Sequence, residues 1–280
     1  MTAQTGTLYV VATPIGNLED LTYRARRVLG EVDVIACEDT RHTRHLLTHY
    51  GITTSLLSYH EHNEVPRTAN LVQRLRRGED VALVSDAGTP GVSDPGYTLI
   101  REAGAAGIPV VPIPGPSAVM AALTASGLPP DRFVFVGFLP RKSGERRRAL
   151  EEIAAVPWTL VIYEAPHRIS AVLHVVRDVF GERKIALARE LTKRFEEVFR
   201  GTISEALEQL RVHAPRGEFT IVVEGAAKER KEGKADAPAR MRALLAGGAA
   251  PTAAVADLMR TAGLSRQEAY RLMLQVKGKR

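Results

Sequence analysis

The chain has 280 residues, of which 45% are hydrophobic and 25% charged, with a net charge of +6 and one cysteine, Cys37. This length suits about two domains of an ordinary globular protein. The single cysteine excludes a disulfide framework and a multi-cysteine metal site and favours a reducing cytoplasmic setting. No apolar run reaches the roughly 18–20 residues needed to span a bilayer, so we expect no membrane span. The first residues show no signal-peptide pattern, so we expect no secretion.

Four short apolar runs in the first part of the chain are predicted strands. They are Leu8–Ala12, Val32–Ala36, Val81–Val84 and Ile108–Ile113, and the polar segments that follow them are TPIGNLED, CEDTRHTR, SDAGTPGVSDPG and PGPSA. Amphipathic segments at Leu21–Leu29 and Pro66–Arg77 are predicted helices. Strands that alternate with helices predict a mostly parallel sheet, and all four polar segments then lie at its carboxyl edge, where ligands bind.

A second set of strands and helices begins near Leu123. The predicted strands are Phe133–Phe138, Trp158–Tyr163, Lys184–Ala188 and Phe219–Glu224, separated by predicted helices at Ser143–Ala155, Ile169–Phe180 and Ile203–His213. The fold class is therefore α/β, with two consecutive α/β domains and a small helical C-terminal module. The predicted boundaries are residues 1–122 and 123–225 for the two domains, 226–238 for a linker and 239–280 for the module.

The C-terminal module carries most of the basic excess. Residues 226–280 contain 12 Lys and Arg against 5 Asp and Glu, so the other 225 residues are close to neutral. A helix, a break at Gly263 and a capping box from Ser265 to Glu268 predict two short helices. They are compatible with a nucleic-acid-binding helix-turn-helix and equally with a helical cap used for packing or dimerisation.

Three further basic clusters, RARR at 24–27, RHTRH at 41–45 and RKSGERRR at 141–148, lie in the two α/β domains. Together with the basic module they suggest a polyanionic partner, although each cluster alone also fits a solvated surface. The segment HEHNE at 60–64 matches no metal signature, so we expect no metal there and interpret it as a solvated or substrate-facing cluster. Fingerprints of P-loop nucleotidases, Rossmann dinucleotide-binding proteins and serine hydrolases are absent.

The segment SDAGTPGVSDPG combines three glycines with two carboxylates, Asp86 and Asp94. Glycines allow the backbone to approach a ligand closely, and the carboxylates favour a cation such as an amine. Ser117 is predicted to cap the helix that follows PGPSA, where free N–H groups can bind a carboxylate. An amine and a carboxylate together describe an amino-acid moiety, although these residues individually also fit turn and capping roles.

Nine segments, in chain order from about Thr7 to Gly225, resemble the tetrapyrrole-methylase family of class III S-adenosylmethionine-dependent methyltransferases. More narrowly, they resemble its bacterial branch that 2′-O-methylates a cytidine of small-subunit (16S) ribosomal RNA. The segments are LYVVATPIGNLEDLTYRARRVL, DVIACEDTRHTRHLL, SYHEHNE, VALVSDAGTPGVSDPG, PIPGPSAVMAAL, GFLPRK, YEAPHRI, ARELTKRFEEVFRG and GEFTIVVEG.

The resemblance implies that S-adenosylmethionine binds in a cleft between the two α/β domains. The residues that match the cofactor motifs are Pro14, Gly16, Asp86, Ala87, Gly88, Asp94, Ser117, Ala118, Tyr163, Glu164, Ala165 and Thr220. It also implies a cytoplasmic homodimer that acts on ribosomal RNA within the small subunit, with no metal and no membrane partner.

Transfer of a methyl group to a ribose hydroxyl benefits from a general base or from a cation near the developing alkoxide. The candidate catalytic residues are Glu190 or Asp39 as base, with Lys193 or Arg168 as the cation that contacts the alkoxide or a phosphate. An ion pair at a strand end is the alternative role of Glu190. The candidate RNA-binding residues are Arg41, Arg44, His60, Arg141, Lys142, Arg146 and Arg168. Two other functions stay open: a methyltransferase of this fold acting on a tetrapyrrole or another small molecule, and a non-catalytic ribosome-binding protein.

Overall fold

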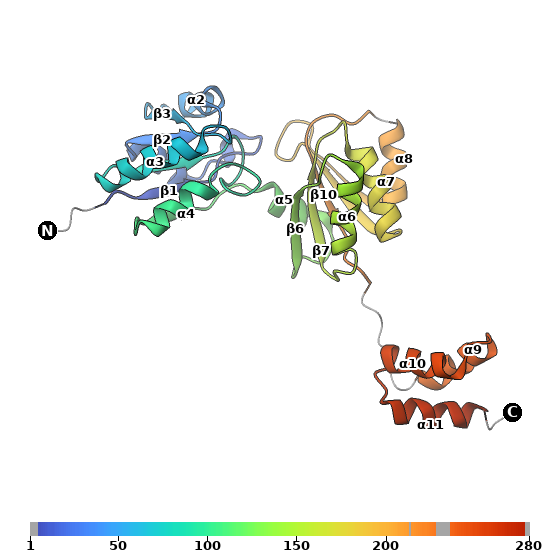
Figure 1. Cartoon of the computed structure of the whole chain (residues 1–280). Coiled ribbons are helices and arrows are strands. Elements are labelled where there is room, and N and C mark those ends of the chain that lie inside the picture. Colours follow the sequence, from blue (N-terminus) through green and yellow to red (C-terminus); the bar gives the residue numbers. More distant parts are fainter. Residues whose placement is uncertain (1–4, 213, 228–235, 278–280) are drawn as a thin grey trace. The chain divides into compact units, whose positions relative to one another are not determined.

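The structure is a computed structural model that describes residues 5–212, 214–227 and 236–277. The chain forms two compact units, Met1–Gly225 and Ala226–Arg280 (Figure 1). The predicted linker lies largely outside the described residues, and the first helix of the second unit begins at Ala237, one residue before the predicted end of that linker.

The first unit begins with a five-stranded sheet in the order β3-β2-β4-β1-β5, in which all neighbouring strands are parallel. Its strands are β1 (Leu8–Val11), β2 (Val34–Cys37), β3 (Ser55–Ser58), β4 (Val81–Val84) and β5 (Val110–Ile113). Its helices are η1 (Leu18–Asp20), α1 (Tyr23–Glu31), α2 (Thr40–His49), α3 (Glu64–Arg76) and α4 (Tyr97–Ala105). The predicted parallel sheet is confirmed, and its polar segments therefore share one edge.

Helices cover both faces of this sheet because the central strands are apolar on both sides. Strands β2 and β4 are buried along their whole length. Leu29 of α1 and Leu47 of α2 pack in one core, whereas Leu71 of α3 and Leu99 of α4 pack in the other.

The second sheet, also within the first unit, has the order β6-β7-β10-β8-β9 and is mixed. Only β6 and β7 pair in parallel, and the other neighbours are antiparallel. Its strands are β6 (Phe133–Phe138), β7 (Thr159–Glu164), β8 (Lys184–Arg189), β9 (Glu197–Thr202) and β10 (Phe219–Val223). Its helices are α5 (Ala118–Ser126), α6 (Ser143–Ile153), α7 (Ile169–Phe180) and α8 (Ile203–Val212), and α6, α7 and α8 lie along one side of it (Figure 1).

Helix α5 covers the opposite face of the second sheet. Its residues Val119, Ala122 and Leu123 share a core with Val161 of β7 and Val222 of β10. The chain thus passes from one sheet to the other before α5, at about residues 114–117. This position differs from the boundary predicted at residue 122, because the apolar face of α5 matches the second sheet and the sequence alone does not show which sheet a helix covers.

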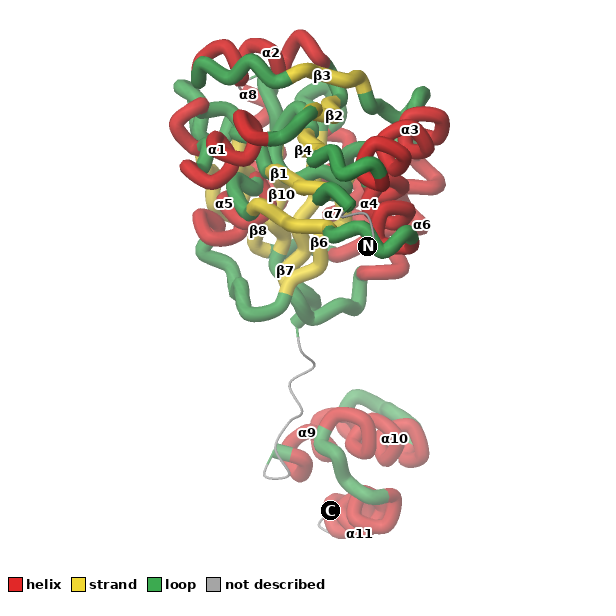
Figure 2. The backbone as a smooth tube through the Cα atoms, turned by 90° about the vertical axis from the view of Figure 1, so that its left-hand side faces the viewer, coloured by secondary structure: helices red, strands yellow, loops and turns green. Residues whose placement is uncertain are grey.

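The second unit is helical in its described part (Figure 2). It contains α9 (Ala237–Ala246), α10 (Pro251–Thr261) and α11 (Arg266–Lys277), which share a small core around Met241, Leu258 and Ala269. The predicted capping box is present, since the Ser265 N–H donates to Glu268 and the Glu268 N–H donates to Ser265 Oγ. Across the described ranges, no helix combines the length and the apolar character needed to cross a bilayer.

Candidate functional site

A cavity of about 620 Å³ lies within the first unit and is lined by loops that follow strands of the first sheet, by the start of α5 and by strands of the second sheet. The loop after β4 and the start of α5 form one part of its wall, and strands β6, β7 and β10 with the segments next to them form another. The lining residues are Ile15, Ala87, Gly88, Thr89, Val92, Ser93, Asp94, Ser117, Ala118, Val119, Met120, Phe135, Phe138, Tyr163, Glu164, Ala165, Pro166, Ala188, Leu191, Glu218, Phe219 and Thr220.

The cavity brings together most of the residues that the sequence assigns to cofactor binding. These are Ala87, Gly88, Asp94, Ser117, Ala118, Tyr163, Glu164, Ala165 and Thr220. Pro14, Gly16 and Asp86 are not part of the lining, although Ile15, between the first two, is. Asp86 instead accepts a hydrogen bond of 3.0 Å from the Asp39 N–H, and Pro14 is buried.

The loop after β4 is tied to the loop after β1. Thr13 and Gly88 exchange two backbone hydrogen bonds of 2.9 and 3.0 Å, and Thr13 Oγ1 donates to the Ser85 carbonyl. Gly88 has a φ of +79°, a left-handed conformation that a side chain would strain. Ser117 caps α5, as predicted, by accepting from the Met120 N–H at 3.4 Å. These contacts hold two adjacent walls of the cavity in place.

Asp94 is the carboxylate of this loop that lines the cavity. Its pKa is raised to about 6, first by burial and then by the nearby carboxylates of Glu38 and Asp86, against the opposing effect of a hydrogen bond with Ser85. A carboxylate whose ionisation is disfavoured in this way is stabilised when a cation binds beside it. The site is therefore suited to a positively charged ligand group.

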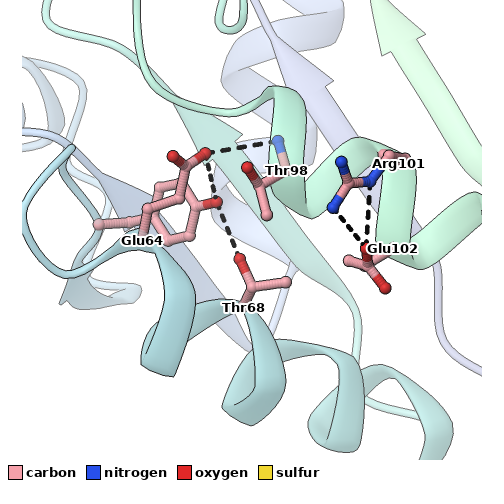
Figure 3. Close-up of polar contacts among 6 residues, drawn as sticks. Glu64, Thr68, Thr98, Arg101 and Glu102 are labelled. Atoms are coloured by element: carbon pink, nitrogen blue, oxygen red, sulfur yellow. Dashed lines mark hydrogen bonds and ion pairs between the residues drawn. The ribbon is translucent and has the colours of Figure 1, made fainter.

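The far end of the same loop is held by Glu64, the last residue of HEHNE. Its Oε1 accepts from the Tyr59 hydroxyl at 3.0 Å and from the Gly96 N–H at 3.4 Å. It also accepts from the Thr98 N–H at 3.4 Å (Figure 3). The Tyr59 hydroxyl also lies 3.0 Å from Thr68 Oγ1. Because Gly96 and Thr98 begin α4, this carboxylate satisfies free N–H groups at a helix N-terminus.

His60 and Asn63 of the same segment contact each other. The His60 N–H donates to Asn63 Oδ1 at 2.9 Å, and the His60 ring Nε2 lies 3.1 Å from Asn63 Nδ2. Within the described residues, no group of three or more His, Cys, Asp or Glu side chains is arranged to hold a metal ion. The predicted contact of His60 with RNA is not tested by this geometry and stays a prediction.

A buried ion pair stands at the end of β7. Arg168 Nε lies 3.2 Å from Glu164 Oε1, whose side chain is 0% exposed. The Arg168 guanidinium also donates to the Leu139 carbonyl at 2.8 Å and to the Pro140 carbonyl at 3.2 Å. Glu164 Oε2 is buried and has no hydrogen-bond partner in the structure, and Glu164 lines the cavity. It is therefore available to a donor group of a ligand.

Lys193 lies between two carboxylates. Its Nζ is 2.9 Å from Glu190 Oε1 and 2.9 Å from Glu218 Oε2, and Glu218 lines the cavity. Burial alone would lower the pKa of Lys193, but the two carboxylates outweigh it and raise that pKa. The hydrogen bond from Lys193 in turn lowers the pKa of Glu190. Neither Glu190 nor Lys193 belongs to the lining of the cavity itself.

The loop that carries this ion-pair cluster is tightly packed. Glu190 has a φ of +50°, and a Cβ on Gly217 would lie 2.4 Å from the Glu190 carboxyl group. A Cβ on Gly16 would lie 2.4 Å from Lys193 Cγ. Glycine at position 16 therefore allows the loop after β1 to approach the loop after β8 at Lys193, and glycine at position 217 allows the segment before β10 to approach the same loop at Glu190.

Asp39 caps helix α2. Its Oδ1 accepts from the Arg41 N–H at 2.8 Å, and this bond is the main reason that the pKa of Asp39 is lowered. Both carboxylates predicted as bases, Asp39 and Glu190, thus have lowered pKa values, whereas an effective base has a pKa near the working pH. Glu190 forms the strand-end ion pair that was its alternative role, and no observation tests catalysis by either residue.

The predicted RNA-binding arginines and lysine fall into two groups. Arg41, Arg44, Arg141 and Lys142 are exposed, whereas Arg146 is only 8% exposed and donates to the Arg141 carbonyl at 3.3 Å. Together with Arg168, Arg146 therefore contacts backbone of the first unit. Exposure leaves the first group accessible to phosphate, and RNA binding by all of them stays a prediction.

Several lining residues were not selected from the sequence. Phe135 and Phe138 are examples. Phe138 lies inside the motif GFLPRK, so a signal existed, but a motif does not show which of its side chains line the cavity. Phe135 lies in an apolar strand, and the face of the sheet on which its side chain lies depends on the strand register.

Comparisons with known proteins agree on one family. A model of the family described as Tetrapyrrole (Corrin/Porphyrin) Methylases matches residues 7–207. Proteins named Ribosomal RNA small subunit methyltransferase I are similar over most of the chain. The protein of Synechocystis sp. is 46% identical over 97% of this chain and 98% of its own, and that of Pseudomonas aeruginosa is 52% identical over 79% of each chain.

Solved structures show the same fold. The crystal structure of uroporphyrin-III-C-methyltransferase from Thermus thermophilus is 25% identical, covers 78% of this chain and 94% of its own, and has a TM-score of 0.55. A structure of Uroporphyrin-III C-methyl transferase from the same organism, complexed with S-adenyl homocysteine, is 20% identical, covers 78% of this chain and 97% of its own, and has a TM-score of 0.56.

Proposed function

The chain belongs to the tetrapyrrole methylase family, and on this premise we propose that it transfers a methyl group from S-adenosylmethionine to the 2′-hydroxyl of a cytidine in small-subunit (16S) ribosomal RNA. The observation that carries the proposal is the 46–52% identity to proteins named as rRNA small subunit methyltransferases, over 97% and 79% of this chain respectively. The cytidine and its ribose hydroxyl come from the resemblance of the nine sequence segments.

The donor set of the cavity fits S-adenosylmethionine. Asp94 would face the cationic part of the cofactor, and the N-terminus of α5 at Ser117 and Ala118 would bind its carboxylate. Tyr163 and Thr220 would lie beside the adenosine, and Glu164 Oε2 is a free acceptor for one of its donor groups. The cofactor supplies an electrophilic methyl group, and the chain's own residues orient donor and acceptor.

Lys193 is the residue that we propose for stabilising the developing alkoxide. Its ammonium is held by Glu190 and by Glu218, and Glu218 belongs to the cavity wall. The lowered pKa of Glu190 favours a role in orienting Lys193 over a role as base. The exposed Arg41, Arg44, Arg141 and Lys142 would contact RNA phosphates, so binding would weaken steeply with salt.

Methyl transfer from tritiated S-adenosylmethionine tests the proposal directly. We expect label in small-subunit RNA, either naked or in assembled subunits, and none in precorrin-like substrates. Label in a tetrapyrrole alone would support the rival small-molecule methyltransferase, and S-adenosylmethionine binding without any transfer would support a non-catalytic ribosome-binding protein. The family resemblance further implies a homodimer in the cytoplasm, which sedimentation and cell fractionation would test.

Asp94→Asn is expected to remove a pH dependence of cofactor binding. The wild-type carboxylate is ionised above its pKa of about 6, so the Kd for S-adenosylmethionine should rise about tenfold between about pH 7 and pH 5. The variant should bind weakly with a flat pH profile by calorimetry. A variant that keeps the wild-type profile would contradict the assignment, and a lowered kcat with unchanged Kd would instead make Asp94 the base.

Although Asp94→Asn is expected to weaken cofactor binding, it is expected to stabilise the unliganded protein at neutral pH. Because the folded-state pKa of Asp94 lies above its ordinary value, the protonated form favours folding, and the wild type loses about 2–3 kcal/mol of stability as pH rises from about 4 to 6. The difference between the two proteins' urea midpoints should therefore grow over this range, with the variant more stable at neutral pH.

Removal of residues 226–280 is expected to weaken binding of RNA or small subunits more than binding of cofactor. The cavity is formed entirely within the first unit, whereas the removed segment carries 12 of the 38 Lys and Arg residues. Titration of the truncated protein with S-adenosylmethionine and with RNA measures both. Equal loss of the two affinities, or no loss of either, would contradict this role of the second unit.

A further inference from the structure

Phe138 is an exposed aromatic residue on the wall of the cavity. It ends strand β6, it lines the cavity, and 58% of its surface is accessible to solvent. Phe135 and Tyr163, which line the same wall, are substantially more buried. The wall of the cavity therefore contains one solvent-accessible aromatic ring, that of Phe138, and two more buried ones.

A β-bulge produces this arrangement. Phe135 lies opposite Val161 and Phe138 lies opposite Tyr163, so β6 has one residue more than β7 between these pairs. Since side chains alternate along a strand, Phe135 and Phe138 would otherwise face opposite sides of the sheet. With the bulge, both rings contact the Tyr163 ring, at centroid distances of 5.0 and 5.5 Å.

The bulge itself depends on Gly137. Its φ of +72° belongs to the left-handed region, and a Cβ there would lie 3.2 Å from Ser93 Oγ in the loop after β4. Position 137 therefore has both a conformational and a steric reason to be glycine, and the orientation of Phe138 follows from it.

The backbone after Phe138 is fixed by two largely buried arginines. Arg168 donates to the carbonyls of Leu139 and Pro140, and Arg146 donates to the next carbonyl, that of Arg141. Because three consecutive carbonyls of this segment accept hydrogen bonds from these guanidinium groups, its backbone has little conformational freedom. The Arg141 and Lys142 side chains are exposed, and Lys142 forms a solvent-exposed pair with Glu145 at 3.2 Å, which contributes little to stability.

An accessible aromatic ring next to exposed cations is the combination that binds single-stranded nucleic acid. Bases stack on aromatic side chains, and cations neutralise the adjoining phosphates. We propose that Phe138 stacks against a nucleobase of the RNA substrate at the rim of the cavity, with Arg141 beside the RNA backbone. This inference rests on the proposed function and deepens it, because it assigns one contact by which the RNA is placed against the reacting site.

Three variants of Phe138 test the stacking role in the full chain. Phe138→Ala should raise the KM for RNA about 5- to 100-fold, the range expected for loss of one base–aromatic stack. The KM of Phe138→Trp for RNA should stay within about threefold of the wild-type value, because tryptophan preserves an aromatic face. Phe138→Leu, which keeps an apolar side chain without a flat ring, should have a KM for RNA close to that of the alanine variant. The Kd for S-adenosylmethionine, measured by calorimetry, should change much less than the KM for RNA in all three.

Different results would separate the inference from the function on which it rests. If Phe138→Leu behaves as wild type, or if Phe138→Ala weakens cofactor binding as much as RNA binding, Phe138 is only part of the cavity wall. If the wild type methylates RNA and Phe138→Ala does so with an unchanged KM, stacking is overturned and the proposed function stands. If the wild type binds S-adenosylmethionine but methylates no RNA, both are overturned.

Discussion

Glu164→Ala is expected to destabilise the protein by about 3–5 kcal/mol, because it leaves the Arg168 guanidinium in a largely buried position without its counter-ion. The Glu164 side chain is 0% exposed and that of Arg168 is 19% exposed, so water cannot replace the lost carboxylate effectively. The only tryptophan, Trp158, directly precedes β7, at whose end Glu164 lies. Its fluorescence during urea unfolding therefore reports on the affected part of the chain.

Two further variants identify the cause of this loss. Glu164→Gln keeps a hydrogen-bond acceptor and should cost less than alanine. The double variant Glu164→Ala with Arg168→Met removes the uncompensated charge together with its partner, so it should be more stable than Glu164→Ala alone. Equal destabilisation by the single and double variants would show that lost packing, and not an unpaired charge, governs the effect.

Lys193→Met is expected to lower kcat for methyl transfer about 10²- to 10³-fold, the usual effect of removing one group that stabilises charge in a transition state. Methionine retains much of the aliphatic stem, which packs against Gly16. The Kd for S-adenosylmethionine should therefore change little. Rapid-quench measurement of a single turnover separates the chemical step from binding and product release.

Glu218→Gln is the matched control for Lys193→Met. It removes the charge of one of the two partners of Lys193 but leaves the ammonium and its bond to Glu190 in place. It should therefore reduce kcat far less than Lys193→Met. A Lys193→Met variant that loses cofactor affinity in proportion to its rate would show that Lys193 serves mainly to hold the loops after β1 and β8 together.

The strongest patterns in the sequence predicted their elements accurately. The helix at Ile169–Phe180 and the strands at Val81–Val84 and Phe133–Phe138 have the predicted bounds. The helix is a regular amphipathic segment and the strands are continuous apolar runs, and both patterns directly reflect which side chains are buried. The polar segments at the carboxyl edge of the first sheet were likewise predictable, because parallel strands place the segments that follow them on one side.

Strands β3 and β9 were not predicted, and both lie at the edge of a sheet. Their residues are exposed or only partly buried, so neither carries a clear apolar pattern. Helix α2, which begins at Thr40, was likewise missed, because its sequence TRHTRHLLTH is dominated by polar residues. The bulge in β6 was invisible for a different reason: an extra residue in one strand is defined only by pairing with its neighbour.

The sequence by itself determined the α/β class, the family and the segments that surround the cavity, because these depend on hydrophobic period and on motifs that are local in the chain. Only the tertiary structure decided which side chains face the ligand and which serve the fold. Asp39 caps a helix, Glu190 pairs with Lys193, and Arg146 and Arg168 contact backbone carbonyls. The physical reason is that a charged side chain takes its role from the partners within a few ångströms of it, and folding brings most of those partners from distant parts of the sequence.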